Sequence, residues 1–368
     1  MILMGERRDI TGTDGRPGMG RVTISQVAAE TGLAKGTVSR ALNDYPDISH
    51  GTKQRVRAAA RALGYTPMAH AQAIRTGRVR AVGLILQMEQ HDAQRPFLAD
   101  FLRGISVAAS AEGWTLTVAT AASQDEGLQT YRRLIADRKA DGFILPRTLW
   151  VDPRAELLRA ADVPFVMYGR TRDDNGCAWF DIRGEEAVRQ AVLRLADLGH
   201  TRIAYLGGDP IYTFAVLRMQ AFRDAMAEAG LKVEEDLIRD GLRDIASGEI
   251  AGASLLDGEA RPTAIVGATD VLAVGAALAA RARGLALGRD VSIIGYDGSP
   301  EGEMLDPKLT TYVVDQAAAG RRLTELLIAR IRGDAPHGLR ETAEAKLRIG
   351  GTDGPPNEQT QTLGRTNT

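Results

Sequence analysis

The stretch TISQVAAETGLAKGTVSRALN, residues 23 to 43, decides how the N-terminal part of the chain folds. Apolar residues recur at helical spacing on either side of Gly32, namely Ile24, Val27 and Ala28 before it and Val38, Ala41 and Leu42 after it. Glycine permits a tight turn here because it adopts left-handed backbone angles without strain. Two short amphipathic helices joined in this way form a helix-turn-helix pattern. A third helix is predicted over residues 51 to 63.

Polar and basic residues cluster where the second of these helices begins. The N-terminal part of such a helix meets base edges in the major groove of DNA, so we expect Lys35 and Arg40 to read bases. The hydroxyl groups of Thr37 and Ser39 are suited to donate hydrogen bonds to phosphates. The predicted DNA contacts in this segment are Thr23, Lys35, Gly36, Thr37, Ser39 and Arg40. The alternative is a pair of solvated amphipathic helices without a nucleic-acid partner.

The charge of the chain is divided between two regions. The whole sequence carries a net charge of −1, which taken alone argues against a nucleic-acid partner. Residues 21 to 80, however, hold ten Lys or Arg against three Asp or Glu, whereas residues 81 to 368 hold 33 against 41. A small basic module is therefore attached to an acidic body, and this division favours approach of the basic module to phosphates.

The length and composition indicate a soluble protein of several domains. The chain has 368 residues, of which 44% are hydrophobic and 25% charged. A single hydrophobic core rarely grows beyond about 250 to 300 residues, so we expect at least two domains. The one cysteine, Cys177, excludes an intrachain disulfide and a cysteine-based zinc cluster. No apolar run reaches the roughly 18 residues of a membrane span, and no export signal is visible, so a cytoplasmic protein is expected.

Between residues 81 and 348 short apolar runs alternate with helical patterns, which is typical of parallel sheets covered by helices on both faces. The predicted strands are 81–86, 114–119, 142–145, 163–168, 203–207, 264–267 and 291–296. The predicted helices are 98–112, 126–138, 183–198, 214–229, 270–283 and 315–332. So many units of this kind indicate two similar α/β sheets.

The sequence does not support an enzyme. The motifs GxSxG, HExxH and GxGxxG and the Walker phosphate loop do not occur in a suitable context. The five histidines, at positions 50, 70, 91, 200 and 337, are scattered, and none is paired with a nucleophile. His200 is expected to fix the turn before a strand. We expect neither catalysis nor a cofactor or bound metal.

Several segments from Arg21 to Thr352 together resemble the LacI/GalR family of bacterial transcription repressors. They are the helix-turn-helix stretch, GYTP followed by an Ala-rich hinge and RTGR, AVGLIL, ADLGHTRIAYLGG, VSIIGYDGSP and LTTYVVDQ. The resemblance implies an α/β fold with a small all-α helix-turn-helix headpiece and a two-subdomain, periplasmic-binding-protein-like core with parallel sheets. Taken with the polar chain ends, it predicts a disordered arm (1–20), the headpiece (21–66), a hinge helix and linker (67–80), a two-lobed effector-binding and dimerisation core (81–349) and a disordered tail (350–368).

The resemblance gives the segment after Pro67 the role of a hinge helix that enters the minor groove, with Ala71 and Ile74 as DNA contacts. Ile74 stands where the family usually has a leucine that wedges between base pairs and bends the duplex. A helix of about eight residues is not stable alone in water, so it needs a partner. Ala34 stands where the family generally has a capping serine. A lost cap costs about 1 kcal/mol, so we expect a headpiece of marginal stability.

The resemblance also implies a small-molecule site at the carboxyl ends of the strands, between the two subdomains. Position matching places the effector contacts at Phe97, Asp181, Arg218, Thr269 and Asp297. A carboxylate accepts hydrogen bonds from sugar hydroxyls and a guanidinium donates to sugar oxygens, so Arg218 and Asp297 carry this prediction. The alternative for an Asp after a strand is a turn or helix cap.

Around residues 242 to 244 the family often places an aromatic residue that stacks on the ligand, and this sequence has none there. Trp179, Tyr212 and Phe214 are possible substitutes, or else core residues.

These features predict a homodimeric, sugar-responsive repressor of carbohydrate-utilisation genes that reads an inverted repeat in double-stranded DNA. Similarity around the hinge and in AVGLILQMEQHDAQRPFL indicates the branch that controls α-glucoside utilisation. Two alternatives stay open at this point: a regulator that needs a purine or other co-repressor, and a plain sugar-binding receptor of the periplasmic type.

Overall fold

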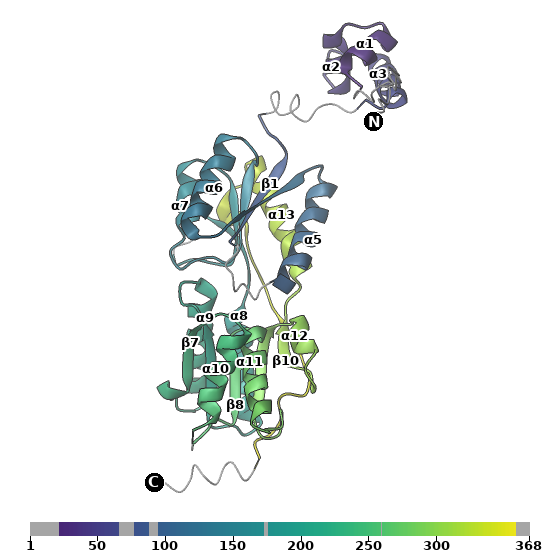
Figure 1. The fold of residues 1–368 in the computed structure, drawn as a ribbon. Helices are drawn as coiled ribbons and strands as arrows, with labels where there is room; N and C mark the ends of the chain where they lie inside the picture. Colours follow the sequence, from purple (N-terminus) through teal and green to yellow (C-terminus); the bar gives the residue numbers. More distant parts are fainter. Residues whose placement is uncertain (1–21, 66–76, 88–94, 173–175, 259, 358–368) are drawn as a thin grey trace, which may run out of the picture. The chain divides into compact units, whose positions relative to one another are not determined.

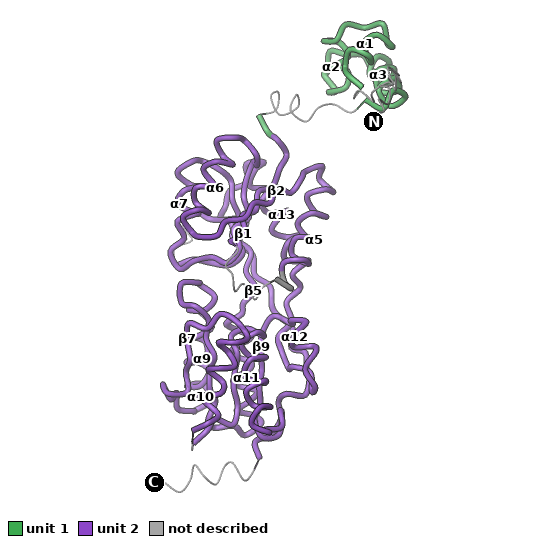
Figure 2. Tube along the Cα trace, in the orientation of Figure 1, with its two compact units in different colours: residues 1–78 green, residues 79–368 purple. Residues whose placement is uncertain are grey.

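The chain forms two compact units, Met1–Arg78 and Val79–Thr368 (Figure 2). The computed structural model describes residues 22–65, 77–87, 95–172, 176–258 and 260–357, and the side chains of residues 95–97 lie outside this description. Within these ranges, no helix combines the length and apolar character needed to cross a membrane.

The described part of unit 1 consists of the helices α1 (Ile24–Thr31), α2 (Lys35–Leu42) and α3 (His50–Leu63). Gly32 ends α1 with a φ of 65°, and its N–H donates to carbonyl groups of the last turn, so the predicted left-handed turn is confirmed. The apolar faces of all three helices meet in one small core, made of Val27, Ala28, Val38, Ala41, Val56 and Ala60.

The first lobe of unit 2 is built on a six-stranded parallel sheet with the strand order β11-β5-β4-β3-β1-β2. Its strands are β1 (Ala81–Gln87), β2 (Thr115–Ala121), β3 (Gly142–Leu145), β4 (Phe165–Tyr168), β5 (Ala178–Ile182) and β11 (Arg340–Ala343). Its helices are α5 (Arg95–Ala111), α6 (Gln124–Ala136), α7 (Pro153–Ala160) and α13 (Gln316–Arg332). Figure 1 shows α6 and α7 on one side of this sheet and α5 and α13 on the other.

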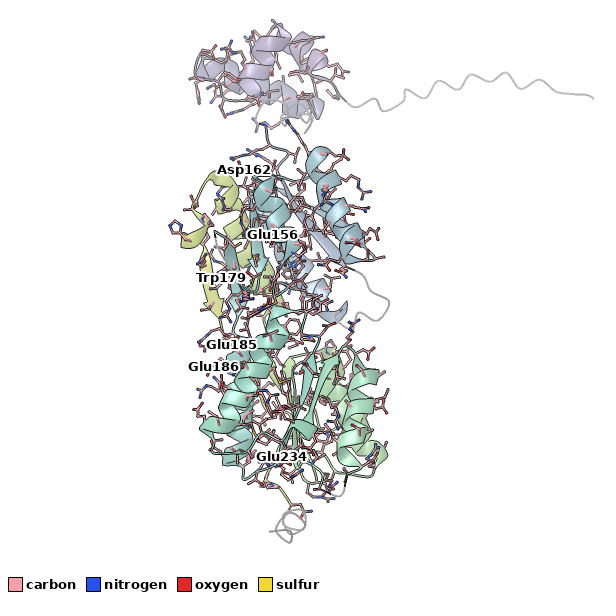
Figure 3. The ribbon with its side chains drawn as sticks, turned by 90° about the vertical axis from the view of Figure 1, so that its left-hand side faces the viewer. Glu156, Asp162, Trp179, Glu185, Glu186 and Glu234 are labelled. Carbon is pink, nitrogen blue, oxygen red and sulfur yellow. The ribbon has the colours of Figure 1, made fainter. Side chains whose placement is uncertain are left out.

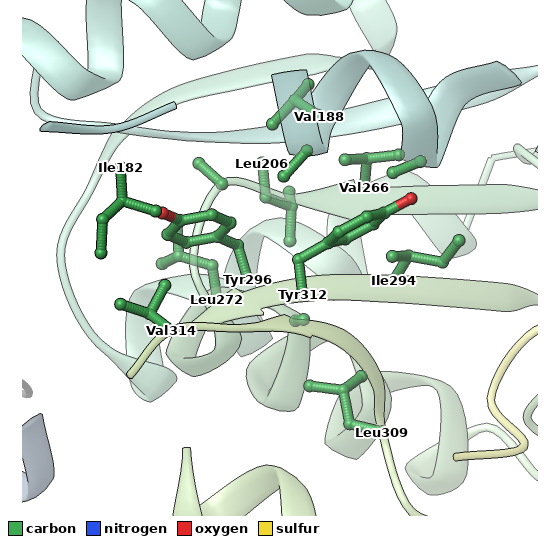
Figure 4. Packing of buried hydrophobic residues seen from close by; sticks show 14 of the residues in the cluster. Ile182, Val188, Leu206, Val266, Leu272, Ile294, Tyr296, Leu309, Tyr312 and Val314 are labelled. Atoms are coloured by element: carbon green, nitrogen blue, oxygen red, sulfur yellow. The ribbon is translucent and has the colours of Figure 1, made fainter. Parts of the chain in front are cut away.

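The second lobe carries a second six-stranded sheet with the order β12-β10-β9-β8-β6-β7, in which only β12 runs antiparallel to its neighbour. Its strands are β6 (Ile203–Gly208), β7 (Ile238–Leu242), β8 (Ala264–Gly267), β9 (Ser292–Asp297), β10 (Thr310–Val313) and β12 (Lys346–Arg348). Its helices are α8 (Gly184–Asp197), α9 (Thr213–Glu228), α10 (Ile245–Leu256), α11 (Asp270–Ala282) and the single turn α12 (Pro300–Glu303). In Figure 4, Ile294, Tyr296 and Tyr312 of adjacent strands pack with Leu206 and Val266 in the core of this lobe.

Every strand and helix predicted between residues 81 and 332 is confirmed, with ends shifted by a few residues. Other elements were not predicted because their sequences lack a clear period. The edge strand β7, with the sequence IRDGL, contains a Gly and two charged residues, and α10 is rich in Gly, Ala and Ser. The chain passes between the lobes three times, from β5 to α8, from β10 to α13 and from β11 to β12.

Residues 350–357 correct the prediction of a disordered tail. Thr352 is fully buried, and its hydroxyl donates to the Ile293 carbonyl at 2.6 Å. The buried carboxylate of Asp353 pairs with Arg194 at 2.7 Å and accepts a hydrogen bond from the Thr310 hydroxyl at 2.5 Å. The segment has too few apolar residues to pack by hydrophobic burial, but hydrogen bonds to strand ends hold it in place. Residues 358–368 and the predicted arm, residues 1–20, lie outside the described residues.

His200 is part of the same buried polar network. Its imidazole is 1% exposed and lies within hydrogen-bond distance of the Thr263 hydroxyl (2.9 Å), the Ser292 hydroxyl (3.0 Å) and the Gly354 carbonyl (2.8 Å). Burial lowers the pKa of this histidine, although the Gly354 carbonyl and the Asp353 carboxylate oppose the effect. His200 lies in the turn between α8 and β6, and its ring also links residues near the starts of β8 and β9 to the tail.

Candidate functional site

The helix α2 presents one face to the headpiece core and the other to solvent. Val38 and Ala41 are buried, whereas Lys35, Gly36 and Arg40 are exposed. Two further predicted DNA contacts, Thr37 and Ser39, are half-buried. Because successive helical residues point in different directions, the exposed residues form one basic surface beside the apolar face. This is the surface that a helix entering the major groove would present.

The starts of α1 and α2 differ in how their free N–H groups are satisfied. Thr23 precedes α1, where its backbone N–H and hydroxyl both donate to the Gln26 side chain, at 2.7 and 3.2 Å. Ala34 precedes α2 and offers no side-chain cap. The structure thus confirms that α2 lacks a side-chain cap, as the sequence predicted. The first turn of α2 therefore keeps amide donors that can meet phosphate oxygens.

Arg40 already has partners within the headpiece. Its guanidinium lies 2.5 Å from the Asp47 carboxylate, with both side chains about half exposed, and 5.2 Å from the centroid of the Tyr45 ring. Exposed ion pairs contribute little free energy, about 0 to 1 kcal/mol, so this pair can exchange for a contact with DNA at small cost.

Two basic residues of α3 contact the turn that follows α2. Lys53 donates to the Asp44 carbonyl at 3.2 Å, and Arg57 pairs with the Asp44 carboxylate. These two side chains therefore stabilise the turn after α2. The predicted hinge contacts Ala71 and Ile74 lie outside the described residues.

A cavity of about 960 Å³ lies in unit 2 and is lined by residues of both lobes. Its walls come mainly from segments that follow strands: the ends of β1 to β5 in the first lobe and of β6 to β9 in the second. Parallel strands bring their carboxyl ends to one edge of a sheet, where open α/β folds bind ligands. The volume is at the upper end of the range of roughly 300 to 1,000 Å³ that is usual for ligand pockets.

Arg218 of α9 lies in this cavity and is 7% exposed. Its guanidinium is 3.8 Å from the centroid of the Tyr296 ring and 4.9 Å from that of Phe214, and one terminal nitrogen, Nη1, donates to the Ala268 carbonyl at 2.6 Å. Its Nε is buried without a hydrogen-bond partner. A Cβ at Gly184 would lie 2.4 Å from that nitrogen, so the glycine makes room for the guanidinium. An unpaired buried donor is costly, so the position of this guanidinium is set by the packing around it.

Asp297 ends β9 with a φ of 125°, a conformation that is unusual for a residue with a side chain. Burial raises the pKa of its carboxyl to about 7, the nearby Arg218 opposes the rise, and Asp270 adds to it. Asp270 fixes the next turn, because its carboxylate accepts hydrogen bonds from the Ser299 N–H at 2.6 Å and the Thr311 hydroxyl at 2.5 Å. The Asp297 carboxyl is therefore held at the cavity wall close to a guanidinium.

The other predicted effector contacts have different surroundings. Thr269 lines the cavity, 8% exposed, directly before α11. Asp181 also lines it, but its carboxylate is engaged by Arg170 at 2.5 Å, and Arg170 also pairs with Glu185 at 2.5 Å. Burial raises the pKa of Asp181 and the Arg170 guanidinium opposes the rise. The side chain of Phe97 lies outside the described residues.

Aromatic rings do line the cavity, although residues 242–244, which also line it, include none. Tyr212 and Phe214 are stacked with their ring centroids 5.6 Å apart. Two of the three predicted substitutes thus lie at the site. Trp179 instead packs against the core of the first lobe, where Figure 3 shows it.

Sequence reasoning did not select three further lining residues, Arg147, Tyr168 and Tyr296. The two tyrosines are the last residues of the predicted strands 163–168 and 291–296, and Arg147 follows the predicted strand 142–145 by two residues. The rule that ligands bind at the carboxyl ends of parallel strands could have found all three.

Two loops from opposite lobes meet at the cavity wall. Their contacts are a β-bridge between Leu149 and Tyr212 and hydrogen bonds from Trp150 N to Ile211 O (3.1 Å) and from Thr213 N to Thr148 O (3.0 Å). The Arg147 guanidinium also lies 4.3 Å from the centroid of the Tyr212 ring. A molecule bound in the cavity would therefore touch both lobes and bias how they are held together.

Comparison with known proteins assigns both units. The model of "Bacterial regulatory proteins, lacI family" matches residues 23–68, and that of a "Periplasmic binding protein-like domain" matches residues 192–352. The HTH-type transcriptional regulator AglR of Rhizobium meliloti (strain 1021) is 32% identical over 340 residues, which cover 91% of this chain and 95% of that protein.

Solved structures are similar over most of the chain. A complex of the transcriptional regulator CelR with cellobiose has 31% sequence identity and a TM-score of 0.69, covering 90% of this chain and all of that one. A lac repressor dimer bound to operator and the anti-inducer ONPF has a TM-score of 0.77 over 91% of this chain at 24% identity, a likeness of fold alone. The predicted combination of a helix-turn-helix headpiece with two parallel-sheet, periplasmic-binding-protein-like subdomains is confirmed.

Proposed function

Because this chain belongs to the lacI family of bacterial regulatory proteins, we propose that it represses carbohydrate-utilisation genes and that a small sugar releases it from its operator or tunes its binding there. The chain is a DNA-binding transcriptional regulator with an effector-binding domain, and its family is not one of enzymes. A plain sugar-binding receptor would not account for residues 23–68, which match the DNA-binding part of the family.

The observation that carries the sugar proposal is the pairing of Arg218 and Asp297 in the cavity. The buried Nε of Arg218 lacks an acceptor, and the Asp297 carboxyl is held nearby without a hydrogen-bond donor among the described side chains. A sugar presents adjacent hydroxyls that can donate to the carboxylate and accept from the guanidinium at the same time. The rings of Tyr212 and Phe214 add a flat apolar surface for the face of a pyranose.

In the DNA-bound state, Lys35 and Arg40 of α2 read base edges, Thr37 and Ser39 contact phosphates, and Thr23 and Gly36 approach the backbone. Two copies of the chain bind as a homodimer, because an inverted repeat presents two equivalent half-sites. Binding of the sugar and of the operator is coupled reciprocally, so each changes the affinity for the other by the same factor.

Within the sugars, α-glucosides are the first class to test. The hinge region and residues 81–98 resemble the branch that controls α-glucoside utilisation. The similar CelR structure, by contrast, holds cellobiose. A panel must therefore contain both kinds of glucoside.

The test couples operator selection to ligand titration. Random DNA is first enriched on the full-length protein, and the selected site is labelled for fluorescence anisotropy. Maltose, trehalose, sucrose, cellobiose, glucose, hypoxanthine and guanine are then titrated into the complex. A sugar that changes operator affinity at least about fivefold, the lower end of typical coupling, supports the proposal. A purine that alone strengthens operator binding would replace it with the co-repressor alternative.

A further inference from the structure

The cavity wall carries more negative than positive side chains. Of the described residues that line it, four are arginines, six are carboxylic acids, and none is a lysine or histidine. The arginines are Arg147, Arg170, Arg218 and Arg243, and the acids are Asp100, Asp181, Glu185, Asp209, Asp244 and Asp297. A site built for a phosphate or carboxylate ligand shows the opposite balance, because the anion needs an excess of donors and positive charge.

Two of the four arginines are already neutralised by the protein. Arg170 is shared between Asp181 and Glu185, with both contacts at 2.5 Å. Arg243 pairs with Asp209 at 2.6 Å. An anionic ligand that approached either guanidinium would have to displace a carboxylate or lie beside it. Both outcomes are unfavourable since like charges at short range repel.

Arg218 is buried, but it does not provide a separate anion site. The positive charge of Arg218 already interacts with the carboxyl of Asp297, which lies on the same cavity wall. Arg147, the fourth arginine, lies over the Tyr212 ring. A neutral hydroxyl can accept from the Arg218 guanidinium and donate to Asp297, whereas a dianionic phosphate can only accept and would be repelled by that carboxylate.

The helix N-termini at the cavity could in principle attract an anion through their free N–H groups. Three of them carry carboxylates of the protein itself. Asp270 stands in the first turn of α11, Glu185 in that of α8, and Asp244 caps α10 by accepting from the Ser247 N–H at 2.8 Å. At these three helix starts the backbone therefore adds little to the attraction of an anionic ligand, whereas the first turn of α9, at the same cavity, holds no acidic residue.

We infer that the effector is an uncharged polyhydroxylated molecule and that sugars bearing a phosphate or a carboxylate are excluded by the charges of the cavity wall. This inference rests on the proposed function, because it names which sugars the site accepts.

Matched pairs of ligands test the inference on the full-length protein. Trehalose is compared with trehalose 6-phosphate, sucrose with sucrose 6-phosphate, and glucose with glucose 6-phosphate, by isothermal titration calorimetry. We expect every neutral sugar that binds to do so at least about tenfold more tightly than its phosphorylated partner, a difference of about 1.4 kcal/mol. Screening by salt should reduce this ratio between 0.05 and 0.5 M, because the discrimination is electrostatic.

The failures of the inference and of the proposed function are distinguishable. A phosphorylated sugar that binds as tightly as its neutral partner, or more tightly, overturns the inference but leaves a sugar-responsive regulator. Binding of a purine with no binding of any sugar overturns both.

Two adjacent glutamates at the start of α8 give a matched pair of variants (Figure 3). Glu185 lines the cavity and shares Arg170, whereas Glu186 is not among the lining residues and pairs with Arg189. Glu185→Gln frees part of the Arg170 charge, so the preference for neutral sugars should fall about threefold or more. Glu186→Gln should keep the parent preference. Equal preferences in the two variants and the parent would overturn the charge-based explanation.

Discussion

Arg40 in the headpiece and Arg218 in the cavity are the arginines to which we assign the two proposed binding functions, and their surroundings differ. Arg40 is half exposed and pairs with an equally exposed Asp47. Arg218 is 7% exposed, lies against two aromatic rings and has a buried Nε without a partner. An exposed ion pair exchanges partners at little cost, whereas a buried donor is fixed in place before its ligand arrives.

The difference would allow one chain to bind DNA, a polyanion, and the uncharged effector that we propose. The headpiece binds a polyanion through mobile, solvated cations whose partners are replaced by phosphates and bases. The cavity of unit 2 offers a small number of fixed polar groups, as expected for the neutral effector that we propose. Changing either arginine or its partners should therefore affect one binding function and spare the other.

The largest effect is expected for Asp297→Asn. The amide cannot accept two charge-assisted hydrogen bonds from sugar hydroxyls, so effector affinity should fall about 100-fold or more, and induction should be lost. Operator affinity without effector should stay at the parent value. Calorimetry and operator anisotropy measure the two quantities. Asp257→Asn, which removes a carboxylate paired with Arg283 and not among the lining residues, serves as the control. Retained induction would remove Asp297 from the site.

Arg40→Ala should have the next largest effect, and on the other function. Loss of a bidentate base contact costs about 1 to 3 kcal/mol, so affinity for the selected operator should fall about 10- to 100-fold while non-specific affinity falls much less. Anisotropy with operator and with random DNA gives the ratio. Asp47→Ala supplies the matched comparison, because it frees Arg40 from its intrachain partner and should leave operator affinity equal or higher. Equal losses on both DNAs for Arg40→Ala would exclude base reading.

The headpiece and the cavity also differ in how far the sequence could predict them. The headpiece is local: Val27, Val38 and Val56 lie close together in the chain, and their helical spacing is enough to place the core. Many strands and helices of unit 2 follow from their periods as well, although β7 and α10 do not. Their carboxyl ends mark the region of the cavity, where Thr269, Asp181 and Asp297 lie, whereas Arg218 of α9 was found only by position matching to the family.

The contacts within the cavity depend on residues far apart in the sequence. Loops from different strands must pack together before Arg170 can pair with Asp181 or Arg147 can lie over the Tyr212 ring. The tail is similar, because Asp353 is held by Arg194, which lies 159 positions earlier in the chain. No local pattern reports such pairings, so the predictions failed where polar groups, rather than apolar periods, determine the structure.

Effector binding and operator binding should also differ in how they depend on pH. The pKa of Asp297 is raised to about 7 in the free protein, and a sugar that donates hydrogen bonds needs the ionised form. Effector affinity should therefore rise about tenfold between pH 6 and pH 8. Calorimetry at pH 6 and pH 8 measures the change in effector affinity. The titrant is maltose, trehalose or another neutral sugar that binds. Operator binding by Arg40 should show no matching increase, because a guanidinium stays charged throughout this range.

The same titration affects the stability of the free protein. Because the folded-state pKa of Asp297 lies above its ordinary value, its contribution to stability is fully present below the ordinary range and is lost as the pH rises through about 7. The Tm of the parent should thus fall relative to that of Asp297→Asn between pH 5 and pH 8. Parallel Tm curves for the two proteins would contradict the raised pKa.

The smallest effect is expected for Ala34→Ser, which restores a helix cap in the headpiece. Ala34 has the extended backbone, with φ −62° and ψ 145°, that a capping residue adopts, so a serine hydroxyl can accept from an N–H of the first turn of α2. The gain should be about 1 kcal/mol, whereas Ala34→Gly should give slightly less than serine because glycine is itself a moderate cap. Amide hydrogen exchange of α2 in the full-length protein measures the change as slower exchange of about fivefold. Slower exchange in unit 2 as well would mean that the headpiece and the effector-binding unit are coupled without DNA, whereas a change confined to α2 would show that the capping energy stays within the headpiece.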